Sequence, residues 1–388
     1  MTSLPRTVVI SEPHPYRAAA KLGGHHYADL FARHGWRVLL LSATFNRWRL
    51  LYPSPGVAEE SLGLWRSGGN RVGPGIVNAT LTHLLPGRVR NRVLWSGISS
   101  LLYSPSPKEL LQRWWGSDRT NLLWLNGNGD WLLRQAIPHD KLVVRIIDNY
   151  EGFSAGYSNL SPIMGKTLES ADGVFACSHF VGDLYRGFRQ DIEVIPNGVD
   201  LERFSEGGLS EPEILKGIPH PRAVYVGAVA DWFDWDLLLA LTRRMPSVHF
   251  VVIGPWLRVE PVSAGSPRNL HILGTVPYAL VPAVLSHCSV GLVPFLLNNL
   301  VKGVSPIKVY EYLAAGLPVV SLRWPELEIE KLPVTLAISF EEFAKGVEEA
   351  LLCSESGRRE LREFAKGCTW EKRLRKLLKR VEVDLDEE

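Results

Sequence analysis

The segment SPIKVYEYLAAGLPVVS, residues 305–321, contains a helix pattern followed directly by a strand pattern. Ser305 is suited to cap a helix, Pro306 to occupy its first position, and Gly316 to end it. The residues after this glycine, 317–321, form an apolar run that predicts a buried strand. The segment therefore predicts one helix-to-strand step of an α/β domain.

Two charged side chains share one face of this predicted helix. Lys308 and Glu311 are three residues apart, and side chains at that spacing are neighbours on a helix surface. They lie near the helix N-terminus, where the helix dipole is positive and anions bind. Two interpretations follow: an anion-binding site, or an ordinary surface ion pair worth about 0.2–0.5 kcal/mol.

The same alternation of strand and helix patterns extends outward along the chain. Apolar strands are predicted at 7–13, 37–43, 121–127, 141–148, 173–178, 192–198, 223–229, 248–255, 269–276 and 290–295. Helical patterns separate them, which predicts parallel sheets covered by helices on both faces. The Gly-, Pro- and charge-rich stretch 199–220 divides the series and is the best linker candidate. We therefore expect an α/β fold with two doubly wound, Rossmann-like domains facing each other across a cleft.

Length and composition agree with two globular domains. The chain has 388 residues, of which 46% are hydrophobic and 22% charged. The N-terminus lacks the pattern of a secretory signal, and no window resembles a membrane-spanning helix. Four cysteines lie singly, without the paired spacing of a metal site or a disulfide framework. We expect a cytoplasmic protein, placed at the inner face of the membrane.

Charge is distributed unevenly along the chain. The first 180 residues carry 19 Lys and Arg against 12 Asp and Glu (+7), and the rest carry 24 against 29 (−5), which together give the net charge of +2. Arginine and tryptophan are mixed at 45–52, 86–95 and 110–119. This mixture suits an anionic membrane surface, or equally arginine packed over core tryptophan. No nucleic-acid-binding motif accompanies the charge, so we expect no nucleic-acid partner.

Four motifs, in order along the chain, resemble those of GT-B fold glycosyltransferases of the family-4-like group, which build bacterial and archaeal surface polysaccharides. They are IPNGVDLERF (195–204), YVGAVADWFDWDLLLAL (225–241), VVIGP (251–255) and PIKVYEYLAAGLPVVS (306–321). The resemblance implies an acceptor-binding domain formed by 1–205 together with a C-terminal helix, 369–388, that crosses back to it. It implies a donor-binding domain formed by 206–368, which would hold a nucleotide-sugar.

In that family the helix in the opening segment points its N-terminus at the diphosphate of the donor. The resemblance implies that Lys308 neutralises the phosphates and that Glu311 accepts hydrogen bonds from the ribose hydroxyls. Ser305 and Ile307, at the start of the same helix, would border the donor.

Other donor contacts come from the preceding motifs. The resemblance implies that Gly227 forms a tight turn near the phosphates, that Phe233 and Asp234 contact the donor, and that Phe295 flanks the base. Two of these have plainer alternatives. A glycine at a strand end is often only a turn, and Asp234 could instead cap the following helix.

The segment LGGHHY, residues 22–27, lies between the first strand and its helix. Gly23 and Gly24 would allow close approach of acceptor or phosphate, and His25 could contact that ligand or act as a structural, capping histidine. The segment lacks the full spaced-glycine fingerprint of dinucleotide-binding proteins, which argues against NAD.

The sequence departs from the pattern of the retaining members of the family, and this departure favours inversion over retention. Retaining members of the family carry a Glu eight positions before the one matching Glu311, and here that position is Gly303. The chain also resembles the inverting xanthan-type β-glucuronosyltransferases, which use an aspartate of the N-terminal domain as base. Asp148, at the carboxyl end of a predicted strand, matches that role, or caps the following turn. Glu151 and Asp130 are reserves.

The function expected from the resemblance is a hexosyltransferase-type reaction that moves a sugar from a UDP-linked donor to a hydroxyl of a glycan or lipid-linked acceptor. We expect inversion and metal-independent catalysis, with no cofactor because the nucleotide-sugar is a substrate. Two alternatives share the fold: a nucleotide-sugar 2-epimerase, and a catalytically inactive nucleotide-sugar-binding scaffold. The sequence leaves open which sugar and nucleotide the donor carries, the acceptor and the linkage, the choice between inversion and retention, and the oligomeric state.

Overall fold

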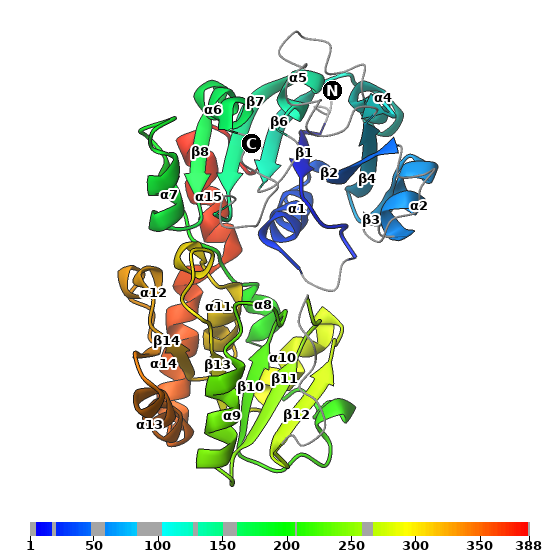
Figure 1. Ribbon diagram of the computed structural model, residues 1–388. Coiled ribbons are helices and arrows are strands. Elements are labelled where there is room, and N and C mark those ends of the chain that lie inside the picture. The colour runs from blue at the N-terminus through cyan, green and yellow to red at the C-terminus, as the bar shows by residue number, and fades with distance from the viewer. Residues whose placement is uncertain are drawn as a thin grey trace. The chain divides into compact units, whose positions relative to one another are not determined.

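The computed structural model describes residues 5–17, 21–47, 59–83, 103–126, 131–149, 161–205, 208–257 and 267–386. The chain divides into two compact units (Figure 1). Unit 1 comprises Met1–Pro196 and Leu374–Glu388, and unit 2 comprises Asn197–Arg373. The first unit thus ends at 196, nine residues before the expected 205, and resumes at 374, five residues after the expected 369.

Local packing explains the shifted boundaries. Phe204 is buried in the core of unit 2, so the residues just before position 205 belong to that unit. Val199 forms a parallel bridge with Thr369, which keeps both segments in unit 2. The chain returns to unit 1 only at Leu374.

Unit 1 is built on a mostly parallel sheet, with nine strands among its described residues. The parallel strands are β1 (Thr7–Ser11), β2 (Arg37–Asn46), β4 (Ile76–His83), β6 (Thr120–Asn126), β7 (His139–Ile146), β8 (Gly173–Ala176) and β9 (Glu193–Val194). Two short strands, β3 (Asn70–Gly73) and β5 (Tyr103–Ser104), pair antiparallel with β4. The order is β3-β4-β2-β1-β6-β7-β8-β9, with β5 beside β4. Prediction from apolar runs missed β3, β4 and β5.

Helices follow the strands of unit 1, as doubly wound folds require. They are α1 (Gly23–Arg33), α2 (Glu59–Ser67), α4 (Pro107–Trp115), α5 (Leu133–Ala136), α6 (Ser161–Ser170) and α7 (His179–Tyr185). Val8, Val9 and Ile10 of β1 are all fully buried, as expected for a central strand covered on both faces.

The last helix, α15 (Trp370–Arg380), carries the chain back to unit 1. Beyond it, the Asp384 carbonyl accepts a hydrogen bond from the Arg6 guanidinium at 2.6 Å, and the Leu385 carbonyl accepts one from Trp36 Nε1 at 2.9 Å. Lys376 pairs with Glu193 at 2.8 Å. The predicted return of the C-terminal helix to the first domain is confirmed.

Unit 2 contains a parallel sheet whose six described strands have the order β12-β11-β10-β13-β14-β15. Their bounds are β10 (Arg222–Val226), β11 (His249–Ile253), β12 (Leu270–Gly274), β13 (Val290–Val293), β14 (Val319–Leu322) and β15 (Thr335–Ala337). Its α-helices are α8 (Leu201–Phe204), α9 (Trp235–Arg244), α10 (Val281–Ser286), α11 (Ile307–Ala314), α12 (Pro325–Ile329), α13 (Phe340–Leu351) and α14 (Glu355–Ala365). The predicted α/β class with two mostly parallel sheets is confirmed.

The stretch 199–220 is not the loose linker that its composition predicts. Helix α8 and a short 3₁₀ turn, η5 (Glu213–Leu215), form in its described part. Phe204, Leu215 and Ile218 are buried in the core of unit 2. Three widely spaced apolar residues anchor this segment, which is too sparse a pattern for periodicity to reveal.

Of the three segments that mix arginine and tryptophan, 86–95 and most of 45–52 lie outside the described residues. In the third segment, Trp114 donates its Nε1–H to the Gly68 carbonyl at 2.9 Å. The guanidinium carbons of Arg113 and Arg71 lie 5.7 and 5.9 Å from its ring centroid. This is arginine stacked on a packed tryptophan, and membrane contact stays a prediction. Among the described residues, no helix has the length and apolar character needed to cross a bilayer.

Candidate active site

Helix α11 begins one residue later than the sequence predicts. Pro306 occupies the N-cap position and Ile307 is the first helical residue. Ser305 does not cap the helix. Its hydroxyl accepts a hydrogen bond from the backbone N–H of Asn197 at 3.1 Å, and its carbonyl accepts one from Asn197 Nδ2 at 2.6 Å. Ser305 thus fastens the start of α11 to the first residue of unit 2, while Gly316 ends the helix with φ +73° as predicted.

Lys308 is surrounded by two aromatic rings and a glycine. Its Nζ is 4.9 Å from the ring centroid of Tyr225 and 4.5 Å from that of Phe295, so both rings stabilise the cation. Burial lowers the pKa of Lys308 to about 8, although the Glu311 charge opposes this shift. In the described part of unit 2, the Lys308 ammonium contacts these two rings and forms no ion pair.

Gly227 has φ +149° and touches this lysine. A Cβ at position 227 would lie 2.8 Å from Lys308 Cε and 3.0 Å from Nζ. Its N–H donates to the Ile253 carbonyl at 2.8 Å, so this amide is already used within the sheet. Gly227 therefore contributes space for Lys308, whereas the resemblance suggests that it forms a turn toward phosphate.

Glu311 is buried, with 7% of its surface exposed. The Tyr278 hydroxyl donates a hydrogen bond to its Oε1 at 2.6 Å. Burial raises the pKa of Glu311 to about 7, and this hydrogen bond and the Lys308 charge partly offset the effect. The interpretation of Lys308 and Glu311 as a surface ion pair is therefore wrong.

Phe233 and Phe295 join the two loops beside this lysine. They form an antiparallel bridge, and both side chains are buried. The Asp234 carboxylate accepts a hydrogen bond from the Leu237 N–H at 2.9 Å, which caps α9. The capping alternative for Asp234 is therefore what the structure shows, and direct donor contact by Asp234 and Phe233 stays a prediction.

In unit 1, Asp148 follows β7 and is partly buried. Burial raises the pKa of Asp148 to about 7, while the positive charge of Arg145 opposes the shift. A carboxyl with a pKa near neutrality is suited to accept a proton from a hydroxyl. The reserve residues Glu151 and Asp130 lie outside the described residues.

In the predicted ligand loop of unit 1, residues 22–27, His25 forms its hydrogen bonds within the protein. His25 Nδ1 accepts the Leu22 backbone N–H at 3.0 Å, and its Nε2 lies 3.1 Å from the His14 carbonyl. Both contacts are satisfied when the proton is on Nε2, and burial lowers the pKa of His25 to about 4, which keeps the ring neutral. His25 is the capping histidine of the second interpretation. Gly23 and Gly24 begin α1 and are buried.

Prediction from the sequence missed a buried polar group beside Asp148. Glu12 follows β1, Asn126 ends β6, and Arg145 lies in β7; none of the three side chains is exposed. Asn126 Nδ2 donates to Glu12 Oε2 at 2.7 Å. Polar residues at or near the carboxyl end of each apolar run were the available signal, because the carboxyl ends of neighbouring parallel strands meet at the same edge of a sheet.

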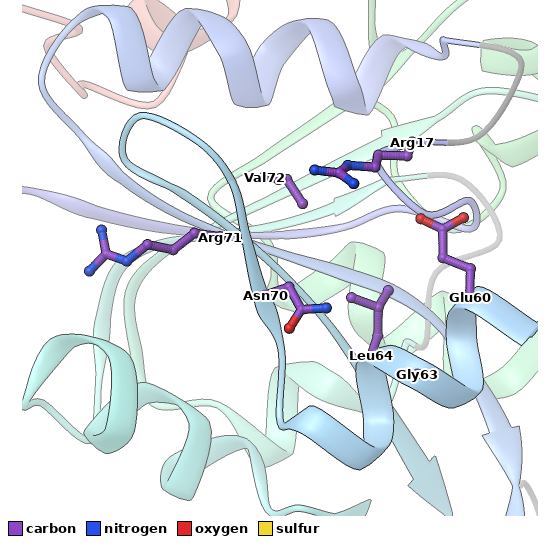
Figure 2. A pocket seen from close by; sticks show the side chains of 7 residues that line it. All are labelled: Arg17, Glu60, Gly63, Leu64, Asn70, Arg71 and Val72. Atoms are coloured by element: carbon purple, nitrogen blue, oxygen red, sulfur yellow. The ribbon is translucent and has the colours of Figure 1, made fainter.

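Unit 1 also has a hollow of about 540 Å³ on its β3 side. Its lining residues are Arg17, Glu60, Gly63, Leu64, Asn70, Arg71 and Val72. Figure 2 shows Arg17 and Glu60 extending toward the same region, with Leu64 and Asn70 beneath them and Arg71 turned away. One cation, one carboxylate and one amide around an open space suit a polyhydroxylated ligand.

Within either unit taken alone, the described residues hold no group of three His, Cys, Asp or Glu side chains close enough to share a metal ion.

Comparison with known proteins gives matches over both units. A model described as Glycosyltransferase Family 4 matches residues 25–203, and one described as Glycosyl transferase-like matches residues 235–379. A Bacillus subtilis protein named as a teichuronic acid biosynthesis glycosyltransferase, TuaH, is 25% identical over 220 residues, or 52% of this chain and 55% of that protein. The chain thus matches about half the length of this relative.

Solved structures share the fold over nearly the whole chain. Anabaena HepE, solved with UDP and glucose, has a TM-score of 0.63 at 14% identity and covers 97% of this chain and 99% of its own. Sucrose-phosphate synthase from Thermosynechococcus elongatus has a TM-score of 0.62 at 16% identity, with 96% and 98% covered. An Escherichia coli trehalose-6-phosphate structure bound to UDP-2-fluoro glucose has a TM-score of 0.62 at 13% identity, with 97% and 98% covered. At these identities the likeness establishes the GT-B fold.

Proposed function

We propose that this chain, a family-4-like glycosyltransferase with the GT-B fold, moves a sugar from a UDP-linked donor to a hydroxyl of a glycan or lipid-linked acceptor during surface polysaccharide synthesis. The observation that carries the proposal is Lys308, a cation without an ion pair in the described part of unit 2, held between Tyr225 and Phe295 at the start of α11. The Bacillus relative and the UDP-bound neighbours support it.

The donor diphosphate would bind at the N-terminus of α11. The first N–H groups of a helix have no partner within the helix, and the dipole favours negative charge there. Lys308 adds a full positive charge, which would stabilise the departing nucleoside diphosphate. The Glu311 carboxylate, oriented by Tyr278, would accept hydrogen bonds from the ribose hydroxyls.

Asp148 would act as the base of an inverting transfer. Its carboxylate would take the proton of the acceptor hydroxyl as the hydroxyl oxygen bonds to the anomeric carbon. The bond from that carbon to the diphosphate breaks, and the nucleoside diphosphate leaves with the electron pair. Lys308 and the α11 terminus supply the positive charge for this step, so we propose that it requires no metal ion.

The hollow near Arg17 would hold a distal part of the acceptor. Five strand-to-strand steps separate β3, which lines the hollow, from β7, which precedes Asp148. Neighbouring strands are about 4.8 Å apart, so the separation is roughly 24 Å. Only an acceptor of several sugar units would reach both places.

A ligand screen with one variant tests the proposal. Thermal unfolding would be measured with UDP, GDP, ADP and dTDP, with and without Mg²⁺. A ligand at a hundred times its Kd stabilises the native state by about 2.7 kcal/mol. We expect a shift with UDP that needs no Mg²⁺ and is lost in Lys308→Ala. A variant that retains the full shift would overturn the donor site.

A scaffold without catalysis is the alternative, because Gly303 stands where retaining members of the family carry the first glutamate of their pair, eight positions before Glu311. Such a scaffold would bind UDP, but neither the wild-type protein nor its variants would transfer sugar. Measuring transfer and UDP binding on the same preparation separates the two functions.

A further inference from the structure

Three neighbouring strands of unit 1 bring Glu12, Asn126 and Arg145 together. Strands β1, β6 and β7 lie side by side in the sheet (Figure 1), and Asp148 follows the last of them. Glu12, Asn126 and Arg145 are fully buried. The proposed mechanism uses Asp148 and leaves the buried carboxyl of Glu12 without a role.

Glu12 is held tightly on one side. Its Oε2 accepts a hydrogen bond from Asn126 Nδ2 at 2.7 Å, and the backbone N–H groups of His14 and Gly24 act to lower the pKa of this carboxyl. A side chain at position 24 would overlap Oε2, so the carboxyl fills the space that a ligand would need at the start of α1. Glu12 thus occupies the place predicted for an acceptor or phosphate.

The other side of the pair lacks a donor. Glu12 Oε1 and Asn126 Oδ1 are both buried, and neither has a hydrogen-bond partner among the described residues. Both atoms are acceptors when the carboxyl is ionised. Buried acceptors without donors are rare in folded proteins. A single proton on Glu12 Oε1, directed to Asn126 Oδ1, would satisfy both atoms at once.

The charges around Glu12 also favour its protonated form. The positive charge of Arg145 acts on both Glu12 and Asp148, and its guanidinium carbon lies 5.4 Å from the Tyr27 ring centroid. If both carboxyls were ionised, the buried cation of Arg145 would face one buried and one partly buried anion. Burial raises the pKa of Glu12 to about 7, although Asn126, the two backbone N–H groups and Arg145 each oppose this.

We propose that Glu12 is a protonated, neutral carboxylic acid that forms a closed acid–amide pair with Asn126, and that it serves as a positioning residue for Asp148. With Glu12 neutral, the charge of Arg145 acts on Asp148 alone and favours its ionised form. The second part rests on the proposed role of Asp148, whereas the first part stands without it.

The Glu12→Gln variant is the matched test, because its amide mimics the protonated acid. At pH 6 Asp148 and Glu311, with a pKa of about 7 each, also contribute to the infrared band of protonated carboxyls. This band should be weaker in Glu12→Gln than in the wild-type protein, and unchanged in the exposed control Glu169→Gln. Equal bands in the wild type and Glu12→Gln would overturn the protonated state.

Stability provides a second readout. The folded pKa of Glu12 lies above its ordinary value of 4.5, so its contribution to stability is full below that value and is lost as pH rises through about 7. Glu12→Gln should therefore unfold at the same temperature as the wild type at pH 5 and at a higher temperature at pH 8. Equal destabilisation of Glu12→Gln at both pH values would contradict the proposal.

The positioning role is tested by the pH profile of transfer. The pKa of Glu12 is about 7, so in the wild type this carboxyl ionises within the same pH range as Asp148 and then competes with it for the charge of Arg145. The Glu12→Gln side chain stays neutral at every pH, so the acid limb of kcat/KM should move to lower pH in that variant. An unmoved limb, with the infrared result as expected, would overturn the positioning role alone. Full activity of an Asp148→Ala variant would instead remove the proposed base and leave the acid–amide pair standing.

Discussion

Gly227 and Lys308 occupy adjoining space at the carboxyl end of β10: a Cβ on the glycine would lie 2.8 Å from Cε of the lysine. The two residues are 81 positions apart in the sequence (308 minus 227). Because Gly227 has no side chain, the Lys308 ammonium can occupy its position beside the end of β10.

Gly227→Ala should weaken UDP binding by displacing Lys308. The added methyl group overlaps the lysine, and φ +149° disfavours any side chain. We expect UDP affinity to fall about 10-fold, equivalent to about 1.4 kcal/mol, with some loss of stability. Gly367→Ala is the control, because a Cβ there meets nothing within 4 Å. Calorimetric titration with UDP measures both; equal affinities would show that Lys308 tolerates the shift.

UDP binding should weaken as pH rises above 8. Burial lowers the pKa of Lys308 to about 8, and only the protonated form attracts the diphosphate. The lysine therefore loses its charge at a pH well below the ordinary range for this residue. Affinity measured from pH 7 to 9.5 should decline in the wild type and stay flat in Lys308→Ala. A parallel decline in both would assign the effect to another group.

Tyr278→Phe should impair recognition of the ribose. The Tyr278 hydroxyl donates to Glu311 Oε1 at 2.6 Å, and its loss leaves the carboxylate less ionised and less well oriented. Loss of a hydrogen bond to a charged group costs about 1.5–3 kcal/mol, or roughly 10- to 100-fold in affinity. The variant should lose affinity for UDP but little for 2′-deoxy-UDP. The same loss for both nucleotides would place Glu311 away from the ribose.

Asp148→Asn should separate binding from chemistry. The amide cannot accept the hydroxyl proton, and loss of a general base lowers the rate by about 10²- to 10⁴-fold. UDP affinity should be unchanged, because the proposed donor residues, Lys308 and Glu311, belong to unit 2. Asp140→Asn, at the exposed start of β7, is the control. Wild-type turnover in Asp148→Asn would eliminate Asp148 as the base.

Arg17→Ala should affect long acceptors only. Its guanidinium lines the hollow on the β3 side of unit 1, five strands from the one that precedes Asp148. We expect the KM for an acceptor of several repeat units to rise about 10-fold, while that of a single unit stays constant. Arg66→Ala, an exposed change on the same helix as Glu60, serves as the control. A uniform effect on both acceptor lengths would argue against a distal subsite.

Most of the fold could be predicted because its signals are local. Fully buried parallel strands such as β1 and β11 appear as short apolar runs, and Gly316 marks a helix end by its own backbone preference. Strands β3 and β5 were missed because they are short and lie at or beside the edge of the sheet. Strand β4 was missed because it contains polar residues such as Asn78 and Thr80, which do not form an apolar run. Their burial depends on partners that are distant in the sequence.

The candidate site was predicted in part. Lys308 and Glu311 share a helix face, so a spacing of three residues was enough to pair them. Their surroundings were not predictable: Tyr225, Phe295 and Tyr278 reach them from other elements. For Asp234 and His25 the sequence could not separate a ligand contact from a helix cap, because the same residue types serve in both roles.

The sequence by itself determined the alternation of strands and helices, the helix-to-strand step at 305–321 and the charge pair on that helix, because each depends on residues close in the chain. The tertiary structure alone decided which charges are buried and what faces them. Glu12 and Asn126 are 114 residues apart and meet only because β1 and β6 are neighbours in the sheet. Desolvation and hydrogen bonding at such a junction depend on the whole packed environment, and this sets the protonation of Glu12, Asp148 and Lys308.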